Sequence, residues 1–508
     1  MLSPNILSKK HYQVITFGCQ MNKSDSERIC GMLDERGALP VLGSGGTSVL
    51  LDADNQPLAD IIVFMTCCVR EAADVRLLGQ VASLKNSSAL IAVGGCIGQR
   101  DGQQLADRMP HIDIVFGTHN LASLPHLLEA ALDNKETHVP QSKAQKQCDS
   151  PVGTHKRCGF PIKAHKRHNP QIEVLSDTEA QVKELTPASH LPTRREHPWH
   201  AWLPIMTGCN NHCSYCVVPS VRGRERSLPM EQLEAEAKRL IDDGVVEISL
   251  LGQNVNSYGR DLYGQPRFAP LLRRIGALGI RRLRFATSHP KDLDQDTIDA
   301  FAQVSAVMPA LHLPVQSGSD AILKAMNRNY SAAHYQNLVE QLRYACQQAG
   351  KPNVALSTDV IVGFPGETDA DFEQTLQLLE QIGFAQVFTF IYSRREGTPA
   401  AALADDTPRS VIQNRFDRLV ACVQKSALAF NEGFVDKNVE VLFEGVSKRS
   451  ATILASKSPW GQTVHVPLPP DHRAEDYAGR FGRVRITSAR TWYLSGSLLE
   501  LESTKQGK

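Results

Sequence analysis

Three cysteines within eight residues form the most chemically informative pattern in the chain. They are Cys209, Cys213 and Cys216, in a CxxxCxxC run that also contains His212. Three thiolates this close on one loop can hold three of the four irons of a 4Fe–4S cluster. The fourth iron then has no protein ligand, and an open metal position allows a cofactor or substrate to bind. A zinc site with His212 among its ligands is the alternative.

A second set of cysteines follows three runs that are rich in β-forming residues. Strands are predicted at 12–17, 60–64 and 89–93, and Cys19, Cys67 and Cys96 come shortly after them. Helical patterns between these runs indicate a parallel sheet, and the carboxyl ends of parallel strands share the edge at which ligands bind. The three cysteines are therefore expected to meet. Burial as ordinary core residues is the alternative.

The remaining elements suggest two further domains. Six strands alternate with helices between 201 and 433, which predicts an open or partial (β/α) barrel with the CxxxCxxC run after its first strand. Short strands after residue 434 predict a small β-barrel. The expected strands lie at 202–206, 246–250, 282–286, 310–313, 356–362 and 385–391, then at 438–443, 452–454, 463–466, 483–489 and 493–499.

The domain division expected from these patterns is 1–133, 134–200, 201–433 and 434–508. Residues 134–200 contain basic and proline-rich stretches without sustained periodicity, so they are interpreted as a flexible linker or insertion. A chain of 508 residues is also too long for one compact core.

Composition excludes some classes of protein. Apolar residues make up 42% and charged residues 21%, as in ordinary globular proteins. No apolar run approaches the ~18 residues of a membrane span, and the first ten residues do not resemble a signal peptide. We therefore expect a cytoplasmic protein without membrane association. The formal net charge of +1 gives no evidence for nucleic-acid binding.

The CxxxCxxC run resembles that of the radical S-adenosylmethionine (SAM) superfamily. Further stretches resemble one family within it, the methylthiotransferases, and cover nearly everything except 134–200. These stretches are residues 18–22, 66–70, 95–99, 216–219, 222–225, 250–255, 287–290, 312–319, 359–368 and 397–400. Residues 20–22 and 287–290 are similar to the branch that acts on N6-dimethylallyladenosine in tRNA.

This resemblance implies a reaction and its cofactors. The open iron at the Cys209, Cys213 and Cys216 cluster would chelate SAM, whose cleavage gives a radical that can attack the C2–H bond of an adenine. Cys19, Cys67 and Cys96 would hold a second 4Fe–4S cluster that carries the sulfur. The product would be 2-methylthio-N6-dimethylallyladenosine at position 37 of the tRNA anticodon loop. An electron donor such as flavodoxin or ferredoxin is implied as a partner.

One residue departs from the family pattern. Cys68 stands where the family usually has another residue. Adjacent residues at a strand end point in opposite directions, so Cys67 is taken as the ligand and Cys68 as a packing residue.

Several other residues are expected to line SAM. Tyr215 matches the position whose backbone approaches the adenine in the superfamily. The strand ends of the barrel should supply the rest, although each of these could equally cap or pack. The expected residues are Gly252, Gln253, Asn254, Ser288, Gln316, Ser317 and Asp359.

The C-terminal segment resembles the TRAM domain, an RNA- or substrate-binding module. Basic residues beside aromatic ones suit phosphate contact and base stacking, a solvated basic face being the alternative. The residues concerned are Arg480, Arg483, Arg485, Arg490, Trp492 and Tyr493.

Two other functions stay open at this point. One is methylthiolation of threonylcarbamoyladenosine in tRNA or of a ribosomal protein. The other is an iron–sulfur electron carrier that binds RNA, although three cysteines per set rather than four argue against it.

Overall fold

The computed structural model describes residues 6–41, 46–68, 71–137, 170–175, 191–351 and 353–503. The chain divides into two compact units, Met1–Arg194 and Arg195–Lys508, each with its own core. None of the helices within the described ranges has both the length and the apolar character needed to cross a bilayer.

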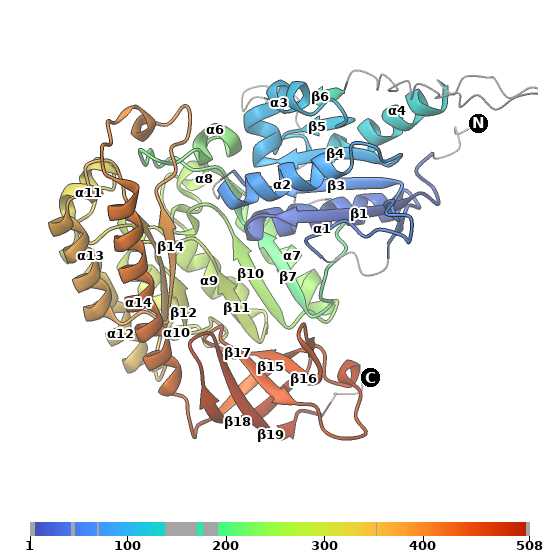
Figure 1. Ribbon diagram of the computed structural model, residues 1–508. Coiled ribbons are helices and arrows are strands. Elements are labelled where there is room, and N and C mark those ends of the chain that lie inside the picture. Colours follow the sequence, from blue (N-terminus) through green and yellow to red (C-terminus); the bar gives the residue numbers. More distant parts are fainter. Residues whose placement is uncertain are drawn as a thin grey trace, which may run out of the picture. The chain divides into compact units, whose positions relative to one another are not determined.

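The first unit is a parallel sheet flanked by helices (Figure 1). Its strand order is β2-β1-β3-β4-β5-β6, and every neighbouring pair is parallel. The central strands are buried on both faces, which explains their continuous apolar sequences. The strands are β1 (His11–Phe17), β2 (Leu39–Pro40), β3 (Ile61–Thr66), β4 (Leu90–Gly95), β5 (Ile114–Phe116) and β6 (Gln171–Glu173). The helices are α1 (Gln20–Glu35), α2 (Glu71–Ser83), α3 (Cys96–Arg108) and α4 (Leu124–Thr137).

The last strand of this sheet corrects one expectation. Gln171–Glu173 pairs with Ile114–Phe116, and the amide of Asn120 donates to the Glu173 carbonyl at 2.6 Å. The Gln99 side chain donates to the carbonyl of Leu175, which is itself buried. The prediction of a linker is therefore wrong for 171–175, because backbone pairing at an open sheet edge needs no apolar periodicity. The stretches 138–169 and 176–190 lie outside the described residues.

The second unit begins with the partial barrel that the sequence predicted. Strands β7 (His200–Pro204), β10 (Glu247–Leu251) and β11 (Arg282–Phe285) form one parallel sheet. Strands β12 (Ala310–His312), β13 (Ala355–Val362) and β14 (Gln386–Ile391) form a second one. A parallel bridge between Leu283 and Val307 connects the two sheets. A short antiparallel ribbon, β8 (Met206–Thr207) and β9 (Arg226–Ser227), flanks the cysteine loop.

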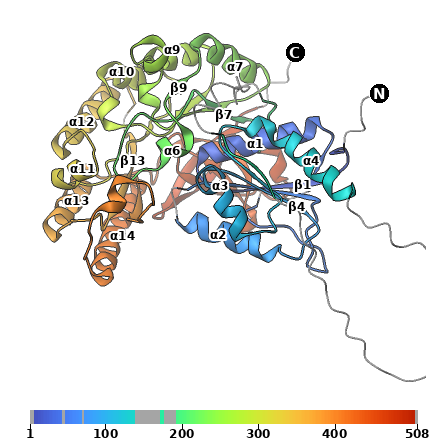
Figure 2. The same cartoon turned by 90° about the horizontal axis from the view of Figure 1, so that it is seen from above.

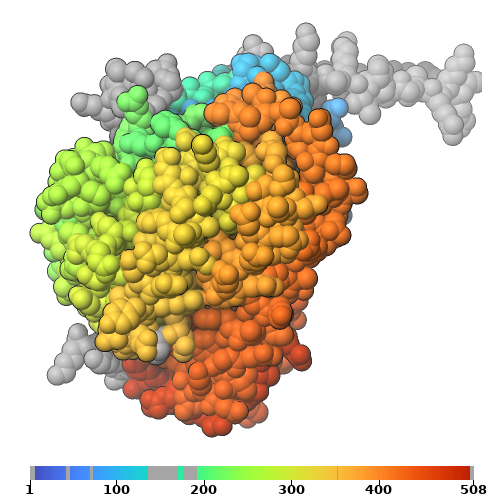
Figure 3. Space-filling view, turned by 90° about the vertical axis from the view of Figure 1, so that its left-hand side faces the viewer, coloured from blue at the N-terminus to red at the C-terminus, as the bar shows by residue number. Residues whose placement is uncertain are grey.

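Helices cover the outside of this barrel, as the view from above shows (Figure 2). Buried apolar residues of the helices and strands make one continuous core. In the space-filling view, helices α11 to α14 form one continuous outer face (Figure 3). The helices are α6 (Val218–Arg222), α7 (Met230–Asp242), α8 (Arg260–Tyr263), α9 (Phe268–Ala277), α10 (Gln295–Gln303), α11 (Asp320–Ala325), α12 (Ala332–Gln348), α13 (Asp369–Ile382) and α14 (Arg409–Glu432).

A closed five-stranded barrel ends the chain, in the order β15-β16-β17-β19-β18. Three arginines at the start of β11 attach it to the parallel strands. Arg282 is 1% exposed and donates to the Lys457 and Glu440 carbonyls, and Arg284 donates to the Ser458 and Pro459 carbonyls. Arg281 stacks on the Phe481 ring, 3.6 Å from its centre. The strands are β15 (Asn438–Ser447), β16 (Ser450–Lys457), β17 (Thr463–Pro467), β18 (Phe481–Ala489) and β19 (Tyr493–Leu501).

Candidate active site

The first unit brings Cys19, Cys67 and Cys96 together. Each follows a strand: Cys19 comes after β1, Cys67 after β3, and Cys96 begins α3 directly after β4. The Cys67 thiol makes hydrogen bonds with Cys19 and Cys96, and these contacts together with burial raise its pKa. The Cys67 amide also donates to the Phe17 carbonyl at 2.9 Å, which joins the ends of β1 and β3. The parallel register thus produces the expected cysteine group at one edge.

Cys68 does not point away from this group. Its thiol makes a hydrogen bond with Cys96, it is fully buried, and the charge of Arg100 acts on it. Its full burial agrees with a packing residue, so the expectation for Cys68 stays a prediction. Because β3 ends at Thr66, the alternation of side chains along a strand does not decide the directions of residues 67 and 68.

Asn22 holds the Cys19 loop against the end of β3. Its side-chain oxygen accepts hydrogen bonds from the Cys19 backbone amide at 3.4 Å and from the Cys19 thiol at 3.3 Å. Its side-chain nitrogen donates to the Thr66 carbonyl at 3.2 Å. Asn22 is fully buried, so each of these bonds would be costly to lose.

Two glycines make room for this arrangement. A Cβ at Gly18 would lie 2.4 Å from the Asn22 side-chain oxygen. Gly95 has a φ of +84°, and a Cβ there would lie 2.6 Å from the Thr66 carbonyl oxygen. Both positions therefore require glycine for the strand ends to approach each other.

The second unit presents Cys209, Cys213 and Cys216 on the loop between β8 and α6. Backbone amides donate to two of the sulfurs, Asn211 to Cys209 and Val218 to Cys216, each at 3.4 Å. Burial raises the pKa of Cys209 to about 11 and that of Cys216 to about 12. These thiols would therefore lose their protons on binding metal, and the amide donors would then stabilise the thiolates.

The backbone around these cysteines is attached at several points. The Ser214 amide donates to the Met326 carbonyl at 3.0 Å, and the Ser214 carbonyl accepts from the Ala400 amide at 2.8 Å. Gly208 has a φ of +75°, and a Cβ there would lie 1.9 Å from the Arg224 carbonyl oxygen. The stretch 397–400 that the sequence singled out thus positions the cysteine loop.

Arg328 is a residue of this site that sequence reasoning missed. Its guanidinium donates to the Cys213 sulfur at 3.5 Å, to the Pro314 carbonyl at 2.7 Å and to the Tyr330 hydroxyl at 2.8 Å. It is 7% exposed. It lies 115 positions from Cys213 in sequence, so no local spacing could have indicated it.

Four polar side chains after β10 and β11 have buried atoms without a hydrogen-bond partner. They are Gln253 Oε1, Asn254 Oδ1, Asn256 Nδ2 and Ser288 Oγ. Buried polar groups are ordinarily paired, so such a group indicates a ligand or water at that place. Thr287 and Gln316, which follow β11 and β12, also have positive φ values of 70° and 75°. Strain of this kind is concentrated at binding sites.

The other residues expected to contact SAM differ in their surroundings. Asp359 is partly exposed and pairs with His312, with 3.6 Å between the carboxylate and the imidazole. Gln316 is buried, and its backbone bridges to β13. Tyr215 packs against the apolar group of Ile322, Met326, Phe364 and Ala400.

Two of the expected residues have mainly structural surroundings. Ser317 is fully buried, and its hydroxyl shares hydrogen bonds with Thr375 and the Ser319 amide. A Cβ at Gly252 would lie 2.7 Å from the Met206 side chain. The Ser317 hydroxyl is thus used inside the protein, and the backbone at Gly252 lies close to Met206.

The cysteine sets fit a cluster better than a single ion. Among the residues that the structure describes, no three His, Cys, Asp or Glu side chains are arranged to hold one metal ion, which gives the zinc alternative no support. A cubane takes one cysteine per iron, so its ligands surround a volume instead of converging on a point.

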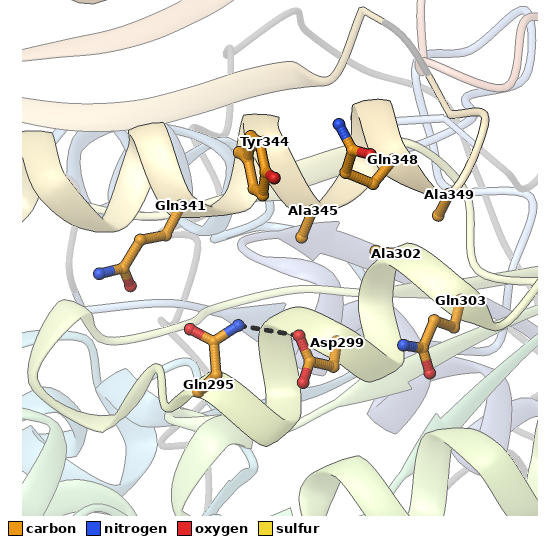
Figure 4. A pocket seen from close by; sticks show the side chains of 9 residues that line it. All are labelled: Gln295, Asp299, Ala302, Gln303, Gln341, Tyr344, Ala345, Gln348 and Ala349. Atoms are coloured by element: carbon orange, nitrogen blue, oxygen red, sulfur yellow. Dashed lines mark hydrogen bonds between the residues drawn. The ribbon is translucent and has the colours of Figure 1, made fainter.

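A groove on the outside of the second unit has none of Cys209, Cys213 and Cys216 in its lining. It has a volume of about 500 Å³ and runs between α10 and α12 (Figure 4). Its lining is rich in glutamine, including Gln295, Gln303, Gln341 and Gln348. Both helices lie on the outer layer of the barrel, so this groove does not contain the strand-end residues described above.

Family models match a part of each unit. Residues 203–379 match the Radical SAM superfamily, and residues 11–117 match the Uncharacterized protein family UPF0004. A solved radical S-adenosylmethionine methyltransferase, TsrM from Kitasatospora setae, is 13% identical with a TM-score of 0.48, covering 77% of this chain and 74% of that chain.

Full-length relatives are much more similar. The tRNA-2-methylthio-N(6)-dimethylallyladenosine synthase of Salinispora arenicola is 42% identical over 90% of this chain and 82% of the relative. The synthase of the same name from Carboxydothermus hydrogenoformans is 39% identical over 97% of this chain and 100% of the relative. The chain therefore belongs to the family of tRNA-2-methylthio-N(6)-dimethylallyladenosine synthases.

Proposed function

We propose that this protein is a radical SAM methylthiotransferase that converts N6-dimethylallyladenosine to 2-methylthio-N6-dimethylallyladenosine at position 37 of tRNA. The reaction follows from the family. The observation that carries its chemistry is the pair of cysteine groups: one follows parallel strands of the first unit, and the other lies on the single loop between β8 and α6. Each cluster is assigned three cysteine ligands, so one of its four irons has no protein ligand and can bind another molecule.

The proposal includes two 4Fe–4S clusters, one held by Cys209, Cys213 and Cys216 and one by Cys19, Cys67 and Cys96. When bound, the first supplies the electron that cleaves SAM to a radical able to take hydrogen from an unactivated C–H bond. The chain contributes amide donors to Cys209 and Cys216 and a cation, Arg328, to Cys213. These groups favour thiolate over thiol at each sulfur.

SAM is proposed to lie along the loops after β10, β11 and β12. Gln253, Asn254 and Ser288 would donate to it or accept from it, because each has a buried polar atom without a partner. Asp359 would accept hydrogen bonds from ribose hydroxyls. Tyr215 and Gln316 would contact SAM through their backbone and form part of the wall of the site. Ser317 and Gly252 would shape the wall of the site.

Iron analysis tests the cluster assignment. The reconstituted protein should hold about eight irons per chain, and Cys213→Ala should keep about four while losing SAM cleavage. A wild-type protein with only four irons would contradict the N-terminal cluster.

RNA contact is proposed for the C-terminal barrel. Trp492 is 56% exposed, and Arg483 and Arg490 are exposed close to it in sequence. Arg485 pairs with Asp436 and Arg480 donates to backbone carbonyls, so these two offer less charge to phosphate than the sequence suggested. Exposed aromatic and basic side chains suit an unpaired loop.

Substrate specificity can be tested with tRNA anticodon stem-loops. A prenyl group is apolar, so its burial should contribute on the order of 2–3 kcal/mol. A stem-loop with unmodified adenosine should then react at least about tenfold more slowly than the prenylated one, since 1.4 kcal/mol is already a factor of ten. Equal rates, or preference for a threonylcarbamoylated stem-loop, would contradict the substrate assignment.

The proposed partners and location follow from the same reaction. Each cleavage of SAM consumes an electron, so a small donor such as flavodoxin or ferredoxin is required. A tRNA substrate supports a cytoplasmic location.

A further inference from the structure

His289 is a buried histidine whose two ring nitrogens have different surroundings. It lies in the loop after β11 and is 7% exposed. Its Nδ1 accepts a hydrogen bond from the Lys291 backbone amide at 3.2 Å. That bond places the proton of a neutral imidazole on Nε2, because the accepting nitrogen cannot also carry it. Within the part of the chain that the structure describes, Nε2 has no hydrogen-bond partner, so one N–H donor is left over.

Contacts on two sides place His289 beside the cysteine loop of the second unit. On one side, Lys291 Nζ donates to the side-chain oxygen of Asn211, within the CxxxCxxC run, at 3.2 Å. On the other side, the imidazole lies edge-on to the Tyr330 ring, with 5.8 Å between the ring centres. The Tyr330 hydroxyl in turn accepts from Arg328, the arginine that contacts a cysteine sulfur. His289 therefore belongs to the surroundings of the site that the sequence did not single out.

The loop that carries His289 has two further features of a binding site. Thr287 has a φ of 70°, which is unusual for a β-branched residue. The His289 backbone amide donates to Asn256 Oδ1 at 3.3 Å, and Asn256 is fully buried. Among the described residues, Asn256 Nδ2 and Ser288 Oγ are buried and have no hydrogen-bond partner. Strained backbone and unpaired buried polar atoms together indicate that a ligand binds here.

The charge state of His289 narrows the chemistry of that ligand. Burial lowers the pKa of the imidazole to about 2, and the charges of Arg328 and Lys291 act in the same direction. A carboxylate beside the ring would favour the charged imidazole instead. The neutral N–H donor therefore suits a neutral acceptor, and the ring nitrogens of adenine are acceptors of this kind.

We propose that the Nε2–H of His289 donates a hydrogen bond to a ring nitrogen of a bound adenosine and so orients its base. This inference rests on the proposed function, in which SAM and the target nucleotide of tRNA both contain an adenosine. No proton is transferred, so the imidazole keeps its tautomer and its charge throughout. The loss of the donor would leave a base nitrogen without its partner, and that loss weakens binding.

Two substitutions separate the roles of the two ring nitrogens. Asparagine places its amide oxygen near the position of Nδ1, so His289→Asn keeps an acceptor for the Lys291 amide and removes the outer donor. Glutamine places its amide nitrogen near the position of Nε2, so His289→Gln keeps the donor and removes the acceptor. Ligand affinity should therefore follow the donor.

Binding is measured anaerobically in two arms, with the full chain and both clusters reconstituted and oxidised. S-adenosylhomocysteine, which has the adenosine of SAM without a transferable methyl group, is titrated by calorimetry. A fluorescent prenylated anticodon stem-loop is titrated by anisotropy. In at least one arm, His289→Asn should weaken binding about tenfold, or 1.4 kcal/mol, while His289→Gln stays within about threefold of wild type. The arm that weakens identifies the adenosine that His289 contacts.

The matched control is His200→Asn. His200 begins β7, at the end of that strand away from the cysteine loop, and its Nε2 bonds with the Ser249 hydroxyl at 3.1 Å. It should leave both affinities at wild-type values. Wild-type affinity of His289→Asn in both arms, or equal weakening by His289→Asn and His289→Gln, would overturn the inference. A wild-type holoenzyme that binds neither ligand would instead contradict the proposed function, so the two failures are distinguishable.

Discussion

Replacing Arg328 is expected to lower the reduction potential of the cluster at Cys209, Cys213 and Cys216. The guanidinium donates to the Cys213 sulfur at 3.5 Å and is almost completely buried. A reduced cluster carries one more negative charge than an oxidised one, so a fixed cation beside it favours reduction. Arg328→Met removes that cation while keeping much of the side-chain volume.

The magnitude follows from two estimates. A full electron charge on the Cys213 sulfur would interact with the guanidinium by roughly 5 kcal/mol at 3.5 Å and an effective dielectric constant of about 20. The added electron spreads over the whole cluster, so a value of about 2 kcal/mol, typical of hydrogen bonds to charged groups, is more realistic. For a one-electron couple this corresponds to a decrease of roughly 90 mV.

The measurement is a redox titration followed by electron paramagnetic resonance. Cys19, Cys67, Cys68 and Cys96 are first replaced by alanine, so that only the C-terminal cluster contributes. Arg328→Lys should recover part of the lost potential because it keeps the charge.

The matched control is Arg343→Met. Arg343 is an exposed arginine of the same unit, and it donates to the Ile382 carbonyl instead of a sulfur. It should leave the potential unchanged. A potential for Arg328→Met within about 20 mV of the parent, where about 90 mV is expected, would refute the reasoning.

Three other substitutions test separate parts of the structure. Asn22→Ala should reduce the iron held at the N-terminal site by at least half with unchanged far-ultraviolet circular dichroism, since Asn22 positions Cys19; full iron content would contradict this role. Burial lowers the pKa of His289 to about 2, below its value in the unfolded chain. The contribution of the neutral imidazole to the free energy of unfolding is therefore fully present above pH 6.5 and is lost as the pH falls. Between pH 7.5 and 5.5, wild type should therefore lose about 1.4 kcal/mol more in urea unfolding than His289→Gln, and equal losses would count against a buried neutral imidazole. Arg282→Met should speed hydrogen exchange in β15, because Arg282 bonds the Glu440 carbonyl there, and unchanged exchange would show that this bond does not hold the barrel.

The sequence predicted the elements that have strong patterns. All six strands of the partial barrel and all five of the C-terminal barrel are found within a few residues of their expected limits. Their runs of β-branched and apolar residues match the burial of each strand. Strand β6 was missed because it has three residues and joins a sheet edge through its backbone.

The sequence was less informative about side-chain direction. The alternation rule cannot decide the direction of Cys68, because β3 ends at Thr66. Arg328 was missed because its contact with Cys213 depends on how two distant loops meet. Ser317 lies in a stretch that resembles the family, yet its hydroxyl is used inside the wall. Motifs locate a site, but the tertiary contacts determine which atoms face it.

The packing of Asn22 between Gly18 and Gly95 also restricts how this region can evolve. Alanine at position 18 collides with the Asn22 side chain, so it can be accepted only after Asn22 has become smaller. A smaller residue at position 22 has already lost the hydrogen bonds to Cys19 and Thr66. Each route away from the present combination therefore passes through a weaker intermediate. The positions behave as one heritable unit, in which the effect of a mutation depends on which other substitution came first.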